Sequence, residues 1–145
     1  MHQPHIAYPI NIRGLHVRET GAKGGLLVTI ENSSNVSTEF QPLDVVRWEQ
    51  CFVDATDAAD GDELLLRFQK QAAGLSEQHE SLPLGLRVTF RGRCAAHGEL
   101  CRAPERWTNQ VRAALTDISS ANIWVEKGRS ETASTSLRNP AKDGP

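Results

Sequence analysis

Residues 86–94 of this chain alternate between apolar and polar side chains, and this pattern constrains the fold more than any other. A period of two is that of a β-strand with one face against a core and the other face exposed. The inward side chains are then Leu86, Val88, Phe90 and Cys94, and the outward ones are Arg87, Thr89, Arg91 and Arg93. The sequence therefore predicts a sheet with one covered face and one basic face.

Apolar residues recur at helical spacing on both sides of this strand. Residues 62–77 form one stripe, and the acidic residues before it suit the positive N-terminal end of a helix. A second stripe follows Pro104, which is favoured in the first turn of a helix, and runs to residue 118. Residues 122–127 resume as a strand, and Trp107 and Trp124 are expected in the core, with base stacking as the alternative. We expect an α+β fold, a two-layer sandwich of antiparallel strands with both helices on one face.

The N-terminal part predicts a β-hairpin. Residues 26–30 are a nearly continuous apolar run, as in a strand buried on both faces, and residues 36–40 resume as a strand after a polar turn at 32–35. The basic residues 13–18 are interpreted as another short strand. In the second half of the chain, a turn is expected at 97–99 and a short strand at 100–101.

Composition limits the function classes that this chain can serve. The net charge is −2 over 145 residues, so any nucleic-acid contact must come from a local basic patch. No apolar run has the length needed to cross a bilayer, and no signal-peptide pattern begins the chain, so we expect a cytoplasmic location and no membrane partner. The three cysteines do not suit a disulfide framework, and the spacing of Cys94, His97 and Cys101 matches no standard zinc motif. We expect no metal site in this chain.

An ordered set of residues carries a family resemblance. Residues 8–24 contain, in order, Tyr8, Pro9, Asn11, Ile12, Gly14, His16, Glu19, Gly21, Lys23 and Gly24, and residues 39–45 contain Glu39, Phe40, Pro42, Leu43, Asp44 and Val45. With the apolar strand between them, they resemble the end of the nuclease domain of SbcD-type DNA-repair exonucleases, in the calcineurin-like metallophosphoesterase superfamily. Weaker similarity continues through residues 88–93, 97–98 and 124–127. Ile10 and Leu15 depart from the family pattern, which has a glycine and a basic or polar residue there.

The resemblance implies a metal-dependent DNA exonuclease in which two divalent, manganese-like ions serve the full-length protein. The Asp-x-His and Gly-His-x-His motifs that hold such ions are absent here, so we interpret the chain as the C-terminal part of such an enzyme, not catalytic alone. Residues 1–50 would be the last strands of the nuclease domain, and residues 51–132 a small α/β cap that helps to bind and orient DNA. Residues 133–145 have the composition of a disordered tail.

Two groups of basic residues are candidate DNA contacts. Arg87, Arg91 and Arg93 share one strand face, where guanidinium groups can follow a phosphate backbone; pairing with nearby glutamates is the alternative. The second group consists of Arg13, His16, Arg18 and Lys23. The resemblance places this second segment near the active site, which implies that His16 approaches the scissile phosphate and that Asn11 helps to position the loop.

Two functions of different classes remain open. In the first, the chain positions DNA for the nuclease. In the second, it is a protein-interaction module that docks the nuclease to an SbcC-like ATPase subunit or to a second copy of itself, as a homodimer. An unrelated α+β domain is the third interpretation. Salt dependence separates the first two, because phosphate contacts weaken steeply as salt rises.

Overall fold

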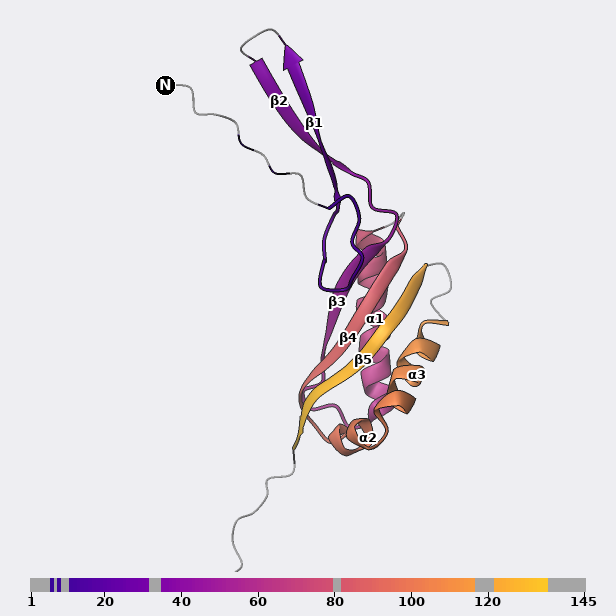
Figure 1. Cartoon of the computed structure of the whole chain (residues 1–145). Helices are drawn as coiled ribbons and strands as arrows, with labels where there is room; N and C mark the ends of the chain where they lie inside the picture. Colours follow the sequence, from indigo (N-terminus) through magenta and orange to yellow (C-terminus); the bar gives the residue numbers. More distant parts are fainter. Residues whose placement is uncertain are drawn as a thin grey trace, which may run out of the picture.

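The computed structural model describes residues 6, 8, 11–31, 35–79, 82–116 and 122–135. The described residues form an α+β fold with a two-stranded sheet and a three-stranded sheet. Their elements are β1 (Gly24–Glu31), β2 (Asn35–Pro42), β3 (Arg47–Asp54), α1 (Gly61–Gln78), β4 (Leu84–Cys94), α2 (His97–Arg102), α3 (Pro104–Ala114) and β5 (Ile123–Ser134). The hairpin β1–β2, here called the arm, extends away from the module that β3 to β5 build with the three helices (Figure 1).

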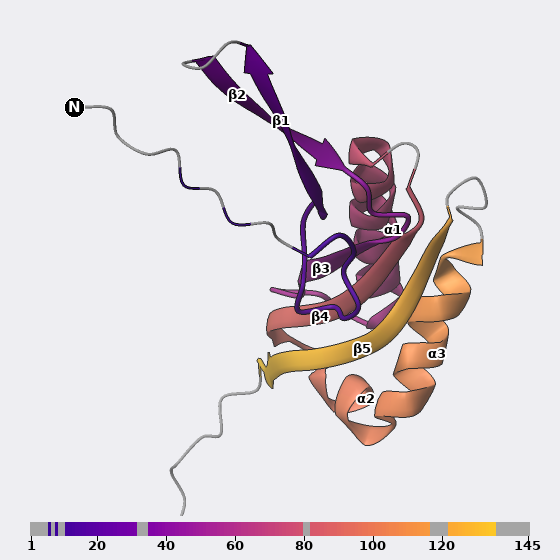
Figure 2. The ribbon, with the colours of Figure 1, turned by 45° about the horizontal axis from the view of Figure 1, so that its top comes forward.

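The three strands of the module are parallel, in the order β3-β4-β5, so the predicted antiparallel sheet is wrong. Each strand is joined to the next by a helical connection, which carries the chain back to the end where it started. Both connections move one strand in the same direction across the sheet, from β3 to β4 and from β4 to β5. Because connections between parallel strands have the same hand, the helices of both connections cover the same face of the sheet. Figures 1 and 2 show α1, α2 and α3 on that one face, as a two-layer arrangement.

The core lies between this helical layer and β4, as the alternation predicted. Leu86, Val88 and Phe90 are completely buried, and Phe68 of α1 is buried with them. Trp107 of α3 is also in the core, where its ring meets Phe90 edge-on at a centroid distance of 5.2 Å. Burying these large apolar side chains is the main source of the module's stability.

The acidic residues before α1 act as helix caps, which confirms their interpretation as a helix start. The Asp60 side chain accepts a hydrogen bond from the backbone N–H of Glu63 at 2.9 Å, and Glu63 accepts from the N–H of Ala59 at 3.0 Å. This reciprocal arrangement satisfies N–H groups that have no partner within the helix. Arg67 continues the network by donating to the carbonyls of Asp54 and Thr56, both at 2.9 Å.

Two segments of the module differ from the prediction. Residues 97–101 belong to the short helix α2, not to a turn and a strand, because six residues are too few for a helical period to be recognised. Strand β5 extends to Ser134, so Ala133 and Ser134 are not part of a tail; residues 136–145 lie outside the described residues. Ile118, expected at the end of the second helix, also lies outside them.

The arm is the predicted antiparallel hairpin, but its apolar strand is not buried. Gly24 pairs with Pro42 and Glu31 pairs with Asn35, while residues 32–34, where a turn was predicted, lie outside the described residues. Val28 and Ile30 are 51% and 69% exposed, because an isolated two-stranded ribbon has no second layer to cover it. The apolar face of the arm consists of Leu26, Val28, Ile30, Val36 and Phe40, which are all exposed.

Candidate functional site

The face of the three-stranded sheet opposite the helices is here called the open face. Alternation along the strands places its side chains there, between residues that point into the core. They are Trp48 and Phe52 of β3, Arg87, Arg91 and Arg93 of β4, and Trp124, Glu126, Lys127, Arg129 and Glu131 of β5. The structure thus keeps the three predicted strand arginines on one surface.

Two of these arginines are held by carboxylates of the neighbouring strand. Arg87 donates from Nε and Nη2 to the two carboxylate oxygens of Glu126, at 2.9 and 3.0 Å. These hydrogen bonds lower the pKa of Glu126 and outweigh the opposing effect of burial. Arg91 donates to Glu131 at 2.7 Å, and its guanidinium lies 3.9 Å above the ring centre of Phe52. The predicted alternative, pairing with glutamates, therefore describes Arg87 and Arg91.

Arg93 is different, because it makes no ion pair among the described residues. The same holds for Lys127 and Arg129, which the sequence analysis did not select. The pairing of β4 with β5 shifts by one residue at Glu126: Leu86 pairs with Val125, but Arg87 pairs with Lys127. Glu126 is the extra residue, and it lies on the same side of the strand as Lys127. Strict alternation from Val125 would place residues 127, 129 and 131 on the core face, so only the register shift at Glu126 brings Lys127 and Arg129 to the open face.

The second predicted group lies in a loop, residues 11–23, that crosses the open face near the start of β3 (Figure 2). The indole Nε1 of Trp48 donates to the carbonyl of Gly14 at 3.1 Å and holds the loop there. No strand forms over residues 13–18, because a turn competes with it: the N–H of Glu19 donates to the carbonyl of His16 at 2.8 Å. Arg13 and Arg18 are exposed, Lys23 is half-buried, and Asn11 is exposed.

The His16 ring is held in a defined orientation by this turn. Its Nδ1 lies 3.1 Å from the backbone nitrogen of Arg18 and accepts that N–H. Because Nδ1 is the acceptor, the ring proton of the neutral imidazole is on Nε2. His16 is exposed, so Nε2 can offer this proton to a ligand.

A partly buried ion pair connects the arm to the module. Asp44 accepts from Nε and Nη2 of Arg47 at 2.7 and 2.9 Å. Burial raises the pKa of Asp44. The hydrogen bonds and the positive charge of Arg47 together lower it by more, so the net change in the pKa is downward. The backbone N–H groups of Leu43 and Asp44 also donate to the carbonyl of Lys23. The base of the arm is therefore joined to the start of β3.

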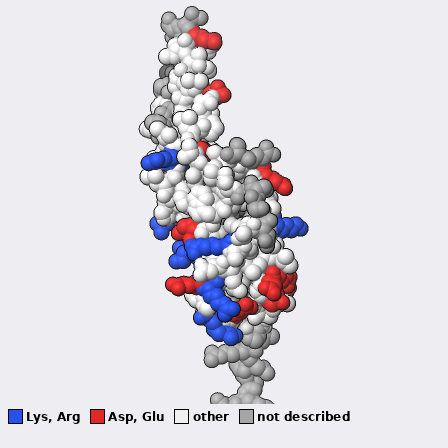
Figure 3. All heavy atoms as spheres, turned by 90° about the vertical axis from the view of Figure 1, so that its right-hand side faces the viewer, with Lys and Arg blue, Asp and Glu red and all other residues white. Residues whose placement is uncertain are grey.

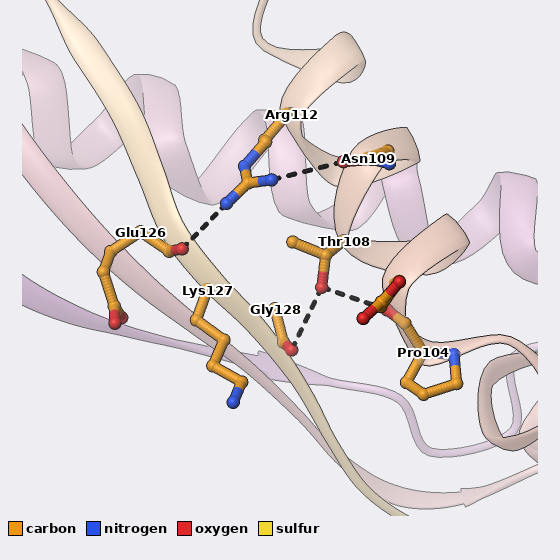
Figure 4. A pocket seen from close by; sticks show the side chains of 8 residues that line it. Pro104, Thr108, Asn109, Arg112, Glu126, Lys127 and Gly128 are labelled. Carbon is orange, nitrogen blue, oxygen red and sulfur yellow. Dashed lines mark hydrogen bonds between the residues drawn. The ribbon is translucent and has the colours of Figure 1, made fainter.

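A groove of about 550 Å³ lies on another side of the module, between α3 and the outer edge of β5 (Figure 4). Arg112 donates to the carbonyls of Val125 and Glu126, and Thr108 donates to the carbonyl of Gly128. These contacts cover the free edge of the strand, which would otherwise invite pairing with another chain. In Figure 4 the side chains of Glu126 and Lys127 point away from Arg112.

The described residues contain no group of three or more side chains suited to hold a metal ion. The three cysteines are free: Cys51 and Cys94 are buried, and burial raises the pKa of Cys51 to about 12. Cys101 is exposed, with its sulfur 3.6 Å from Nδ1 of His97. Within the part of the chain that the structure describes, no helix is long and apolar enough to cross a membrane.

Comparison with known proteins identifies the module. Residues 48–133 match the family described as the middle domain of metallophosphoesterase YhaO. The chain belongs to this family. The match covers the three-stranded module and stops short of the arm. The chain is also 31% identical, over 114 residues, to a protein of Bacillus subtilis (strain 168) named "Uncharacterized metallophosphoesterase YhaO". No solved structure matches it.

The Bacillus subtilis relative is longer than the part that this chain matches. The alignment covers 79% of this chain and 27% of the Bacillus subtilis relative, so the chain spans about a quarter of that protein. The family is that of a middle domain, whereas the sequence resemblance implied the C-terminal part of an SbcD-type enzyme. Membership of a metallophosphoesterase family implies the use of divalent metal ions by the whole protein.

Proposed function

We propose that this chain is the DNA-positioning region of a metal-dependent DNA-repair exonuclease, with the metal site on another part of the protein. The observation that carries the proposal is the row of cations on the open face, beside a loop with further basic residues. Arg93, Lys127 and Arg129 make no ion pair among the described residues, although the charges of Lys127 and Arg129 act on Glu126, so their side chains are available to phosphate oxygens. Membership of a phosphoesterase family agrees with a phosphodiester as the substrate.

The residues of this chain would bind and orient the strand. Arg93 and Arg129 supply charge on the open face, while Arg87 retains one guanidinium nitrogen outside its two hydrogen bonds to Glu126. His16 offers Nε2–H toward a phosphate oxygen, since Nδ1 is occupied by the N–H of Arg18. Two manganese-like ions bound elsewhere would activate water and stabilise the leaving oxygen.

The arm supports the proposed domain organisation. In this organisation residues 1–50 complete the phosphoesterase domain and residues 51–132 form the cap beside it. The exposed face of Leu26, Val28, Ile30, Val36 and Phe40 is what a strand pair would offer to the second layer of a larger domain. The ion pair of Asp44 and Arg47 lies just before the boundary between the two parts and would hold the base of the arm at the start of β3.

The test is a titration of the whole chain with labelled duplex DNA at low and moderate salt. The variants Arg93→Glu and Arg129→Glu remove charge without breaking an ion pair, and Arg106→Glu on the exposed surface of α3 is the matched control. We expect affinity to fall with salt, and each open-face variant to bind more weakly and to reduce the salt slope by about one. Arg106→Glu should bind as the wild type does. Equal loss in all three variants would refute a site on the open face.

One observation favours a different function, docking to a protein. The apolar face of the arm suits an SbcC-like ATPase subunit or a second copy of the chain, and neither requires DNA. Figure 3 shows few charges on the arm and mixed charges over the module below it. Light scattering of the wild type and of Val28→Lys tests self-association, which should disappear in the variant and should be insensitive to salt. Salt-independent dimers with no DNA binding would favour docking over DNA positioning.

A further inference from the structure

Trp124 is an exposed aromatic residue at the start of the open face. Its accessible fraction is 39%, whereas that of Trp107 in the core is 3%, so the prediction that both belong to the core is wrong for Trp124. The neighbouring Val125 points into the core and is 4% exposed, and alternation therefore turns Trp124 to the opposite face. A large ring is thus presented on the same surface as the cations.

The Trp124 ring is held in place by its neighbours. Its centroid is 5.6 Å from that of Trp48, and the two planes cross at 78°. Trp48 is itself fixed by its hydrogen bond to Gly14. Both rings lie over Gly85, where a Cβ atom would be 2.9 Å from Cζ2 of Trp124. Because the ring is already ordered, a ligand that stacks on it loses little additional conformational freedom.

Trp124 also borders a groove of about 340 Å³, whose other lining residues are Arg112, Leu115, Thr116, Ile123 and Val125. This groove lies on the α3 side of β5, so the platform beside the cations is the exposed ring of Trp124 itself. Along β5, Lys127 and Arg129 follow Trp124 on the open face within roughly 17 Å, at about 3.3 Å per residue. An aromatic platform next to a row of cations is the combination that binds single-stranded nucleic acid.

We propose that Trp124 stacks on an unpaired base of a single-stranded nucleic acid whose phosphates are bound by Lys127, Arg129 and Arg93. The inference rests on the proposed function and adds a preference for unpaired strands to it. Bases within a duplex are stacked on one another, so their faces cannot reach an indole ring, whereas an unpaired base can. The neighbouring cations favour a polyanion over an apolar protein segment at this site.

The experiment compares three labelled ligands with the whole chain: an oligothymidylate, an abasic strand of the same length and a duplex. We expect Trp124→Ala to weaken oligothymidylate binding roughly five- to 100-fold and to leave the other two affinities unchanged. Trp124→Phe keeps an aromatic ring and should restore most of the lost affinity. Arg129→Glu should weaken binding of all three ligands. Oligothymidylate, but not the abasic strand, should quench the indole fluorescence of the wild type.

The outcomes distinguish this inference from the proposed function. If Trp124→Ala binds oligothymidylate as the wild type does while Arg129→Glu weakens all binding, stacking is refuted and DNA positioning stands. If the wild type binds none of the three ligands, both are refuted. Far-UV circular dichroism establishes that the variants are folded. Should Trp124→Ala fail to fold, Trp124→Phe and the quenching measurement decide the question, because equal quenching by the abasic strand contradicts stacking.

Discussion

Replacing Gly85 by alanine is expected to destabilise the module, because the site has no room for a methyl group. An added Cβ would lie 2.6 Å from Cε3 and Cζ3 of Trp48 and 2.9 Å from Cζ2 of Trp124. Ordinary carbon–carbon contacts are roughly 3.5–4.0 Å, so the rings would have to move by about 1 Å. Trp48 cannot retreat freely, since it donates to the Gly14 carbonyl at 3.1 Å. Overpacking of this kind costs about 1–3 kcal/mol.

The assay is urea unfolding followed by far-UV circular dichroism, together with thermal unfolding. Each kcal/mol should lower the midpoint temperature by roughly 4–8 °C for a module of this size. Gly74→Ala is the matched control, because nothing lies within 4 Å of its Cβ position in α1. This control should gain roughly 0.5–1 kcal/mol, since alanine favours the helix. A Gly85→Ala protein as stable as the wild type would refute the reasoning about the two rings.

Two further predictions concern buried groups. Asp44→Asn should cost about 1–3 kcal/mol at neutral pH, because it removes the charge that strengthens the hydrogen bonds of the partly buried ion pair with Arg47. The pKa of Asp44 in the folded protein is lower than its ordinary value of 3.8. The ionised carboxylate therefore contributes to the free energy of unfolding above pH 3.8, and this contribution is lost as the pH falls through the folded-state pKa. Unfolding free energies between neutral and acid pH should therefore fall more steeply for the wild type than for Asp44→Asn; equal slopes would contradict the assignment. In a thiol alkylation series, Cys101 should react in the native protein, and Cys51 and Cys94 only after urea unfolding. Native labelling of all three thiols, read by mass spectrometry, would contradict the buried core.

The pattern of apolar and capping residues within one segment was sufficient to predict the elements that need no distant contact to form. The stripe of Leu64, Phe68 and Ala72 predicted a helix over residues 62–77, and α1 spans Gly61–Gln78. All three side chains are completely buried. The capping residues Asp60 and Glu63 begin this helix within one turn, so no distant contact was needed to recognise it.

The sequence pattern did not predict whether neighbouring strands run parallel or antiparallel. Leu86, Val88 and Phe90 point inward whether the neighbouring strands are parallel or antiparallel, because side-chain alternation is the same in both. The direction follows from the connections, in which each helix returns the chain before the next strand begins. The site was only half predicted: Arg93 was selected, but Arg129 was not, because the predicted strand ended at residue 127 and the register shift at Glu126 reverses the faces of the residues after it.

The sequence by itself determined the α+β composition, the helices α1 and α3 and the basic face of β4, because each depends on neighbours within one segment. The tertiary structure decided the parallel order of the sheet, the exposure of Trp124 and the pairing of Arg87 with Glu126. These features depend on which segments meet in space. A shift of one residue in the register of β5 reverses the face on which each later side chain lies, and no local pattern reports that shift.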